Sequence, residues 1–132
     1  MLISEQNVEI VRRVVAALNA RDLDGYLACC CEDVALHLPV VAGVYEGPEG
    51  IKRWFADIED AGPDFHIDLR GVKAIGGNQV LAFTHVASTG RASGIALTME
   101  NAIIYDLIDG KISRIRIFLD QGAALKAVGL EE

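Results

Sequence analysis

The sequence has few of the residues that metal and nucleic-acid sites require. Its three cysteines are contiguous, Cys29 to Cys31, and no C-x-x-C motif or histidine pair accompanies them. A tetrahedral zinc site needs such partners, so we expect no metal ligand set. Lysine and arginine form no cluster, and the net charge is −7. This argues against a nucleic-acid partner, because a phosphate backbone is held by clustered cations.

Long apolar segments are also missing. No apolar run approaches the roughly 20 residues that cross a bilayer. The N-terminus lacks the basic and then apolar pattern of a secretory signal. We therefore expect a soluble, cytoplasmic protein that makes no membrane contact. The chain has 132 residues, 52% of them hydrophobic, which predicts a single domain over residues 1–132 with a full core.

Apolar spacing predicts two helices at the N-terminus. Valines and a leucine recur three and four residues apart in the first helix, which Ser4 is placed to cap. Asp22 can cap a second helix that continues through the cysteines. In that helix Cys30 shares a face with Leu23 and Tyr26, so we interpret the cysteine run as packing. A reactive thiol would want a histidine or a helix N-terminus beside it, whereas this run lies near the end of the expected helix and acidic residues follow it.

The rest of the chain predicts one more helix, then mostly strands. Pro48 suits the first turn of a third helix, which Gly62 and Pro63 end. Alternation of apolar and polar residues predicts strands at 34–38, 65–75, 79–89, 95–108 and 111–120, followed by a short helix at 121–130. We read residues 41–47 as a loop. Helices followed by an antiparallel meander indicate an α+β architecture, with three helices covering one face of the sheet.

Three segments resemble the SnoaL-like branch of the nuclear transport factor 2-like superfamily. They are "VAALNARDLDGYLACCCEDVAL", "YEGPEGIKRWFADI" and "DGKISRIRIFLDQGAALKAVGL". The resemblance implies a cone-shaped α+β barrel of cystatin-like topology, in which a curved, mostly antiparallel sheet wraps around three N-terminal helices. It also implies a pocket between the sheet and the helices, and a homodimer built on the sheet. These motifs are scaffold motifs, so they say little about activity.

The superfamily's catalytic residues are mostly absent at the matching positions. The ketosteroid isomerase tyrosine falls on Val14, its general base on Leu38, and its oxyanion-hole aspartate on Ile103 or Ile104. Aliphatic side chains cannot move a proton, which argues against steroid isomerase activity. Polyketide cyclases use a cavity carboxylate, for which Asp120 is the nearest match. An epoxide hydrolase needs two carboxylates around an arginine, and Arg116 with Asp120 supplies part of that set.

Asp109-Gly110 is a strong signal for a two-residue β-hairpin turn. With this turn Ile108 faces Lys111, and regular pairing from there predicts the content of each hairpin face. The face that we interpret as a pocket wall carries Met99, Asn101, Ile103 and Tyr105 beside Arg114, Arg116, Phe118 and Asp120. A dimer interface has a similar composition, so that interpretation stays open. A single β-bulge would exchange the faces and bring Glu100 and Thr84 inside.

The sequence therefore nominates two sets of site residues. Asp120 is the candidate acid/base and Arg116 its partner, whose positive charge keeps the carboxylate ionised; alternatively, Asp120 caps the last helix. The candidate ligand contacts are Asn101, Tyr105, Ile103, Met99, Trp54, Phe55, Leu38 and His85.

We predict a protein that binds a small apolar molecule without a cofactor. Cyclase, isomerase or hydrolase chemistry at Asp120 is one extension of this prediction. The alternative is a non-catalytic ligand-binding or dimeric interaction module.

Overall fold

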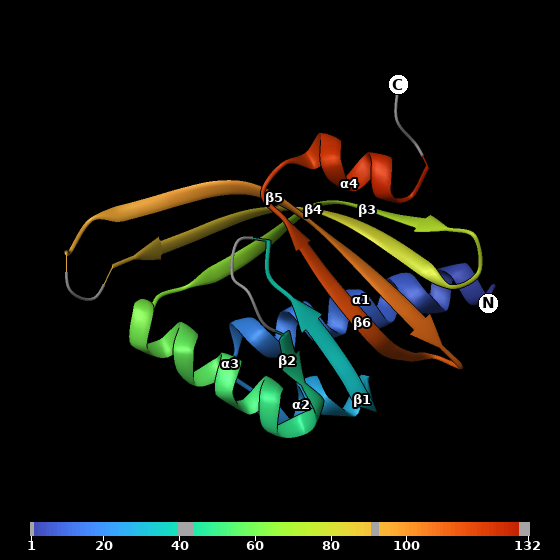
Figure 1. Ribbon diagram of the computed structural model, residues 1–132, viewed down its shortest axis with the longest axis horizontal. Coiled ribbons are helices and arrows are strands. Elements are labelled where there is room, and N and C mark those ends of the chain that lie inside the picture. Colours follow the sequence, from blue (N-terminus) through green and yellow to red (C-terminus); the bar gives the residue numbers. More distant parts are fainter. Residues whose placement is uncertain (1, 40–43, 91–92, 130–132) are drawn as a thin grey trace.

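The computed structural model describes residues 2–39, 44–90 and 93–129, which form four helices and a six-stranded sheet (Figure 1). The elements in chain order are α1 (Ile3–Asn19), α2 (Leu23–Ala28), β1 (Cys30–His37), β2 (Val44–Glu46), α3 (Gly47–Ala61), β3 (His66–Ile75), β4 (Gln79–Thr89), β5 (Ala96–Ile108), β6 (Lys111–Phe118) and α4 (Gln121–Ala127).

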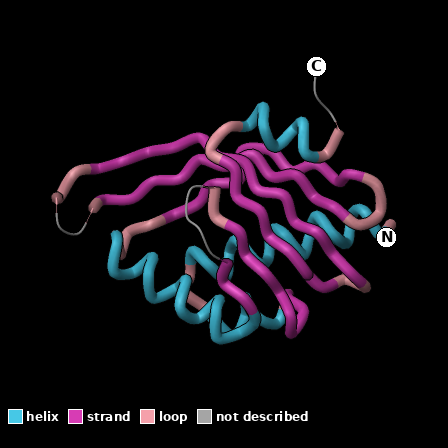
Figure 2. Tube along the Cα trace, viewed as in Figure 1, coloured by secondary structure: helices cyan, strands magenta, loops and turns pink. Residues whose placement is uncertain are grey.

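The sheet has the strand order β2-β1-β6-β5-β4-β3. Its strands pair antiparallel except for β1 and β6, which run parallel. The sheet curves without closing, with α1, α2 and α3 on its inner face and α4 on its outer face (Figure 2). The predicted α+β class, with a curved sheet around three N-terminal helices, is confirmed, although the sheet is open.

The main core lies between the inner face and the first three helices. Val11, Val14 and Leu18 of α1 are buried, as the helical spacing predicts. Every second residue of β4, from Val80 to Val86, faces this core, because successive strand residues point to opposite faces. The remaining alternate residues form the outer face, where α4 buries Leu81, Ala102 and Ile104 in a second, smaller core.

The hairpin turn between β5 and β6 is as predicted, but the register beyond it is not. Asp109 and Gly110 both have positive φ, at 50° and 76°, and Ile108 pairs with Lys111. The pairing then shifts by one residue, so that Asp106 faces Arg114 and Leu107 faces Ile112. Ser113 is therefore the extra residue of a β-bulge. Regular pairing through the hairpin was the wrong expectation.

The spacing of apolar residues along β6 explains the bulge. Ile112 and Ile115 are both fully buried, yet they are three residues apart, so a regular strand would place them on opposite faces. The extra residue at Ser113 lets both point inward. As a consequence, Arg114 and Arg116 point to the outer face.

Three further local expectations were wrong. The second helix ends at Ala28, and Cys30 begins β1 instead of continuing the helix. The helix α1 begins at Ile3, with Leu2 at the N-cap position and no side-chain cap from Ser4. Part of the expected loop forms β2, which pairs with β1; the rest of that loop, residues 40–43, lies outside the described residues.

Candidate functional site

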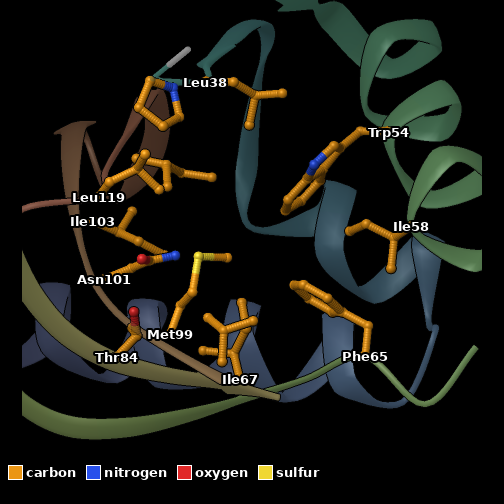
Figure 3. Close-up of a pocket in the computed structure, with 13 residues that line it drawn as sticks. Leu38, Trp54, Ile58, Phe65, Ile67, Thr84, Met99, Asn101, Ile103 and Leu119 are labelled. Carbon is orange, nitrogen blue, oxygen red and sulfur yellow. The ribbon is translucent and has the colours of Figure 1, made fainter. Parts of the chain in front are cut away.

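A pocket of about 230 Å³ opens between the inner face of the sheet and helix α3 (Figure 3). It is lined by Leu38, Pro39, Trp54, Ile58, Phe65, Ile67, Thr84, Val86, Met99, Asn101, Ile103, Ile117 and Leu119. Met99 and Leu119 are 47% and 46% exposed, so they lie at the mouth. The deeper side chains are buried, and the pocket is a cleft in the main core.

The positions of the side chains that line the pocket follow from the periodicity of helix α3 and strand β5. Trp54 and Ile58 lie four residues apart on α3 and share its buried face. Met99, Asn101 and Ile103 alternate along β5 and point to the inner face. Figure 3 shows Trp54, Ile58 and Phe65 on one side of the pocket, opposite Asn101 and Ile103.

Thr84 and Asn101 form the only polar part of the described lining. They lie directly opposite each other on β4 and β5. Thr84 is fully buried and Asn101 is 7% exposed, yet Thr84 Oγ1 and Asn101 Oδ1 have no hydrogen-bond partner among the described residues. Most buried polar groups in proteins have a hydrogen-bond partner, so two unpartnered oxygens on neighbouring strands need an explanation.

The described lining contains no acidic, basic or thiol side chain. No side chain among these residues can take up or release a proton at neutral pH. The pocket can therefore surround an apolar molecule and offer it hydrogen bonds.

Five of the residues nominated from the sequence line this pocket: Leu38, Trp54, Met99, Asn101 and Ile103. The other nominated contacts lie elsewhere.

Tyr105 and Phe55 are buried in the main core. The Phe55 ring packs edge-on against the ring of Tyr26, with 5.2 Å between the ring centroids. His85 is on the outer face, where its Nδ1 pairs with the Glu100 carboxylate across β4 and β5. Its position follows from strand alternation, since the neighbouring Thr84 faces inward.

Arg116 and Asp120 do not line this pocket, because the bulge at Ser113 turns Arg116 to the outer face. Arg116 donates to Asp106 Oδ1 at 3.4 Å. Asp120 is the N-cap of α4 and accepts from the Gly122 amide at 2.9 Å. Both side chains line a second, more open hollow of about 520 Å³, which extends to the outer face and shares Leu38, Pro39, Ile117 and Leu119 with the first pocket. The expectation that they share a pocket wall with Asn101 was wrong.

Thr84, Phe65, Ile67 and Ile117 belong to the lining without having been nominated as ligand contacts. Thr84 carried a signal, because it is the polar member of the inward-facing series in "VLAFTHV". Phe65 and Ile117 look like any core residues in sequence, and only the packing places them at a cavity.

The cysteines lie where α2 ends and β1 begins. Cys29 and Cys30 are buried and Cys31 is partly exposed, and all three are free thiols. Burial, followed by the neighbouring Cys29 and Cys31 thiols, raises the pKa of Cys30 to about 12. Among residues 2–39, 44–90 and 93–129, no three His, Cys, Asp or Glu side chains are grouped to hold a metal.

Stability is expected to fall as the pH rises from 9 towards 12. The unfolded Cys30 thiol ionises from about pH 9, whereas the folded one stays protonated to about pH 12. The contribution of the protonated Cys30 thiol to the free energy of unfolding is thus fully present below pH 9. Above pH 9 it is lost at up to about 1.4 kcal/mol per pH unit for one such group. Urea unfolding across this range measures the slope. Cys30→Ala should flatten it more than the control Cys31→Ala, and equal slopes in both variants would contradict the prediction.

No helix in the described part of the chain is long and apolar enough to cross a membrane.

Comparisons with known proteins agree with this fold. A family model of the SnoaL-like domain matches residues 11–115. The solved structure of Bal32a, from a soil-derived mobile gene cassette, is 24% identical and covers 87% of this chain and 89% of its own, with a TM-score of 0.80. TerC, co-crystallised with polyporic acid, is 22% identical over 93% of this chain and 98% of its own, with a TM-score of 0.78.

SalBIII, described as an epoxide hydrolase/cyclase-like enzyme in pyran ring formation, is 20% identical over 89% of this chain and 92% of its own, with a TM-score of 0.77. None of the curated proteins matches. At these identities the structural likeness shows a shared fold.

Proposed function

The chain belongs to the SnoaL-like domain family, and from this premise we propose that it binds a small, neutral, largely apolar molecule in the pocket beneath α3. One observation carries the proposal: a cavity of about 230 Å³ whose described walls are apolar except for Thr84 and Asn101. An apolar cavity of about 150 Å³ is enough for benzene. The pocket is below the roughly 300–1,000 Å³ of sites for drug-sized ligands. A substituted ring or a fused pair of rings suits this size.

The structural relatives support small-molecule binding by analogy. TerC was crystallised with polyporic acid, and SalBIII is described as an epoxide hydrolase/cyclase-like enzyme. In this chain the described pocket lining contains no proton donor or acceptor that titrates near neutral pH. Binding is therefore the function that the geometry supports best.

We expect indane, an apolar bicyclic probe, to bind wild-type protein, and Met99→Phe to weaken that binding by about tenfold or more. Phenylalanine at the mouth would fill space that the ligand needs, and overpacking costs about 1–3 kcal/mol. Calorimetric titration measures the affinity. Trp54 is the single tryptophan and lines the pocket, so its fluorescence reports occupancy.

The matched control is Thr98→Phe, which makes the adjacent residue of β5 aromatic on the opposite face of the strand. This variant should bind indane like the wild type. Equal weakening in both variants, or no heat and no change in Trp54 fluorescence with indane, would show that the pocket is not the binding site.

A second candidate function is hydrolase-type chemistry in the second hollow, which Arg116 and Asp120 line. The observation that favours it is the placement of Arg116, which donates to Asp106 and lines the same hollow as Asp120. The Asp120 carboxylate could activate water as a general base, and the nearby guanidinium could hold an electrophilic substrate by its oxygen. Turnover of indene oxide to its diol, lost in Asp120→Asn, would establish this candidate.

Under the binding proposal, Asp120→Asn is expected to change the affinity for indane by less than about twofold. Asp120 lies outside the pocket, and asparagine caps a helix about as well as aspartate, so α4 should persist. Titration of the variant with indane measures this. A large loss of affinity with α4 intact would contradict the binding proposal and favour a role for Asp120 at the ligand.

The homodimer through the sheet stays a prediction. On the outer face, α4 already buries Leu81, Ala102 and Ile104 within one chain. The exposed apolar side chains Ile95 and Leu97 lie instead at the end of the β4–β5 hairpin that projects beyond the helices (Figure 1).

A further inference from the structure

We propose that the ligand carries a hydroxyl group, and that this group docks on the Thr84–Asn101 pair at the base of the pocket. This inference rests on the proposed binding function and specifies the ligand as a neutral alcohol or phenol on a ring skeleton. It starts from the two unpartnered oxygens, Thr84 Oγ1 and Asn101 Oδ1.

The pair is built into the sheet. Both residues point to the inner face from the middle of paired strands, directly opposite each other. Such cross-strand neighbours have Cβ atoms about 4.5–5.5 Å apart, so one ligand atom can reach both side chains. Figure 3 shows the Thr84 hydroxyl just below the Asn101 amide, whose nitrogen is turned toward the pocket; a half-turn of the amide exchanges its nitrogen and oxygen and presents the unpartnered oxygen to a ligand.

The hydrogen-bonding needs of the pair select the ligand group. The Thr84 hydroxyl can donate or accept, the amide oxygen of Asn101 accepts, and its nitrogen donates. A ligand hydroxyl also donates and accepts, so it can pair with Thr84 and with either end of the Asn101 amide. A ketone oxygen only accepts and leaves the amide oxygen without a donor. A hydrocarbon leaves both residues unpaired, which costs binding free energy.

The rest of the pocket determines what the hydroxyl is attached to. Trp54 and Phe65 lie across the cavity from the pair (Figure 3), so a ring whose hydroxyl reaches Thr84 would lie against these two aromatic side chains. No charged side chain lines the described pocket, so an ionised ligand would lose its hydration without a counter-charge. A neutral ring with one hydroxyl satisfies both conditions.

The test compares three probes with one skeleton: 1-indanol, 1-indanone and indane, each titrated into wild-type protein by calorimetry. We expect 1-indanol to bind about tenfold more tightly than indane, which corresponds to one net hydrogen bond. The ketone should fall between them. Tighter binding of 1-indanone than of 1-indanol would overturn the hydroxyl assignment in favour of a carbonyl.

Variants at Thr84 locate the effect. Thr84→Val keeps the shape of the side chain and removes the hydroxyl, so the preference for 1-indanol over indane should fall to about one. Thr84→Ser keeps the hydroxyl and should keep the preference. Thr98→Val, the same change at an exposed position of β5, should behave like the wild type. An unchanged preference in Thr84→Val would overturn the docking site.

The outcomes separate this inference from the proposed function. If no probe binds, the binding function itself is wrong. If all three bind the wild type equally and Met99→Phe weakens them all, the pocket binds ligands but the Thr84–Asn101 pair does not select a hydroxyl.

Discussion

Thr84→Val is expected to raise the free energy of unfolding of the ligand-free protein by about 1–3 kcal/mol, the cost of a buried polar group without a partner. Thr84 Oγ1 is such a group, since the residue is fully buried and its hydroxyl has no hydrogen bond to any residue that the structure describes. Valine has nearly the same shape and an equally good strand propensity, so the packing of β4 should not change. Urea unfolding, with a shift of the midpoint at constant slope, measures the gain.

Thr98→Val serves as the control for this prediction. Thr98 is exposed on β5, where the same change should alter stability by no more than about 0.5 kcal/mol. A Thr84→Val variant less stable than the wild type would mean that the hydroxyl is satisfied in solution, and the argument for a ligand group there would lose its basis. A stabilised variant that loses its preference for 1-indanol would instead show that the wild type keeps an unfavourable hydroxyl for recognition.

Insertion of one alanine between Arg114 and Ile115 is expected to abolish cooperative folding. With one more residue after the bulge, the part of β6 that follows would slip by one position, and every side chain there would change face. Ile115 and Ile117 would turn outward and Arg116 would turn into the apolar core. Each exposed isoleucine costs about 1.5–3 kcal/mol. An unpaired buried charge costs about 3–5 kcal/mol, so the total rivals the usual stability of 5–15 kcal/mol for a domain.

Circular dichroism during heating measures this effect. The control is Ser113→Ala, which keeps the number of residues and loses only the bond from Ser113 Oγ to the Asp106 carbonyl, 3.2 Å long. It should cost about 0.5–1.5 kcal/mol. If the insertion variant unfolds cooperatively near the wild-type temperature, the assigned inner face of β6 is wrong.

Several elements could be predicted because their causes are local. The spacing of Val11, Val14 and Leu18 predicts a helix with one buried face, and α1 has that face. Asp109 and Gly110 tolerate positive φ, which determines a two-residue turn wherever the rest of the chain lies. The alternation in β5 correctly predicted that Asn101 faces the same side as Ile103.

The site was only half predictable, because it depends on how distant segments align. The register of β6 changes by one residue at Ser113, and this single step moves Arg116 and Asp120 away from the face that carries Asn101. The cause was visible in the sequence as the three-residue spacing of Ile112 and Ile115. Periodicity alone could not show whether one of them would be exposed or a bulge would bury both.

The sequence by itself determined the helices, the meander and its tight turn, because spacing and turn chemistry act within a few residues. Only the tertiary structure decided which side chains share the cavity: Phe65 follows α3, Thr84 comes from β4 and Ile117 from β6. It also decided that Thr84 lies opposite Asn101 on β4 and β5, and that neither side-chain oxygen has a hydrogen-bond partner in the described part of the chain. The physical reason is that burial and hydrogen-bond satisfaction are properties of the whole packing, to which segments far apart in the chain contribute together.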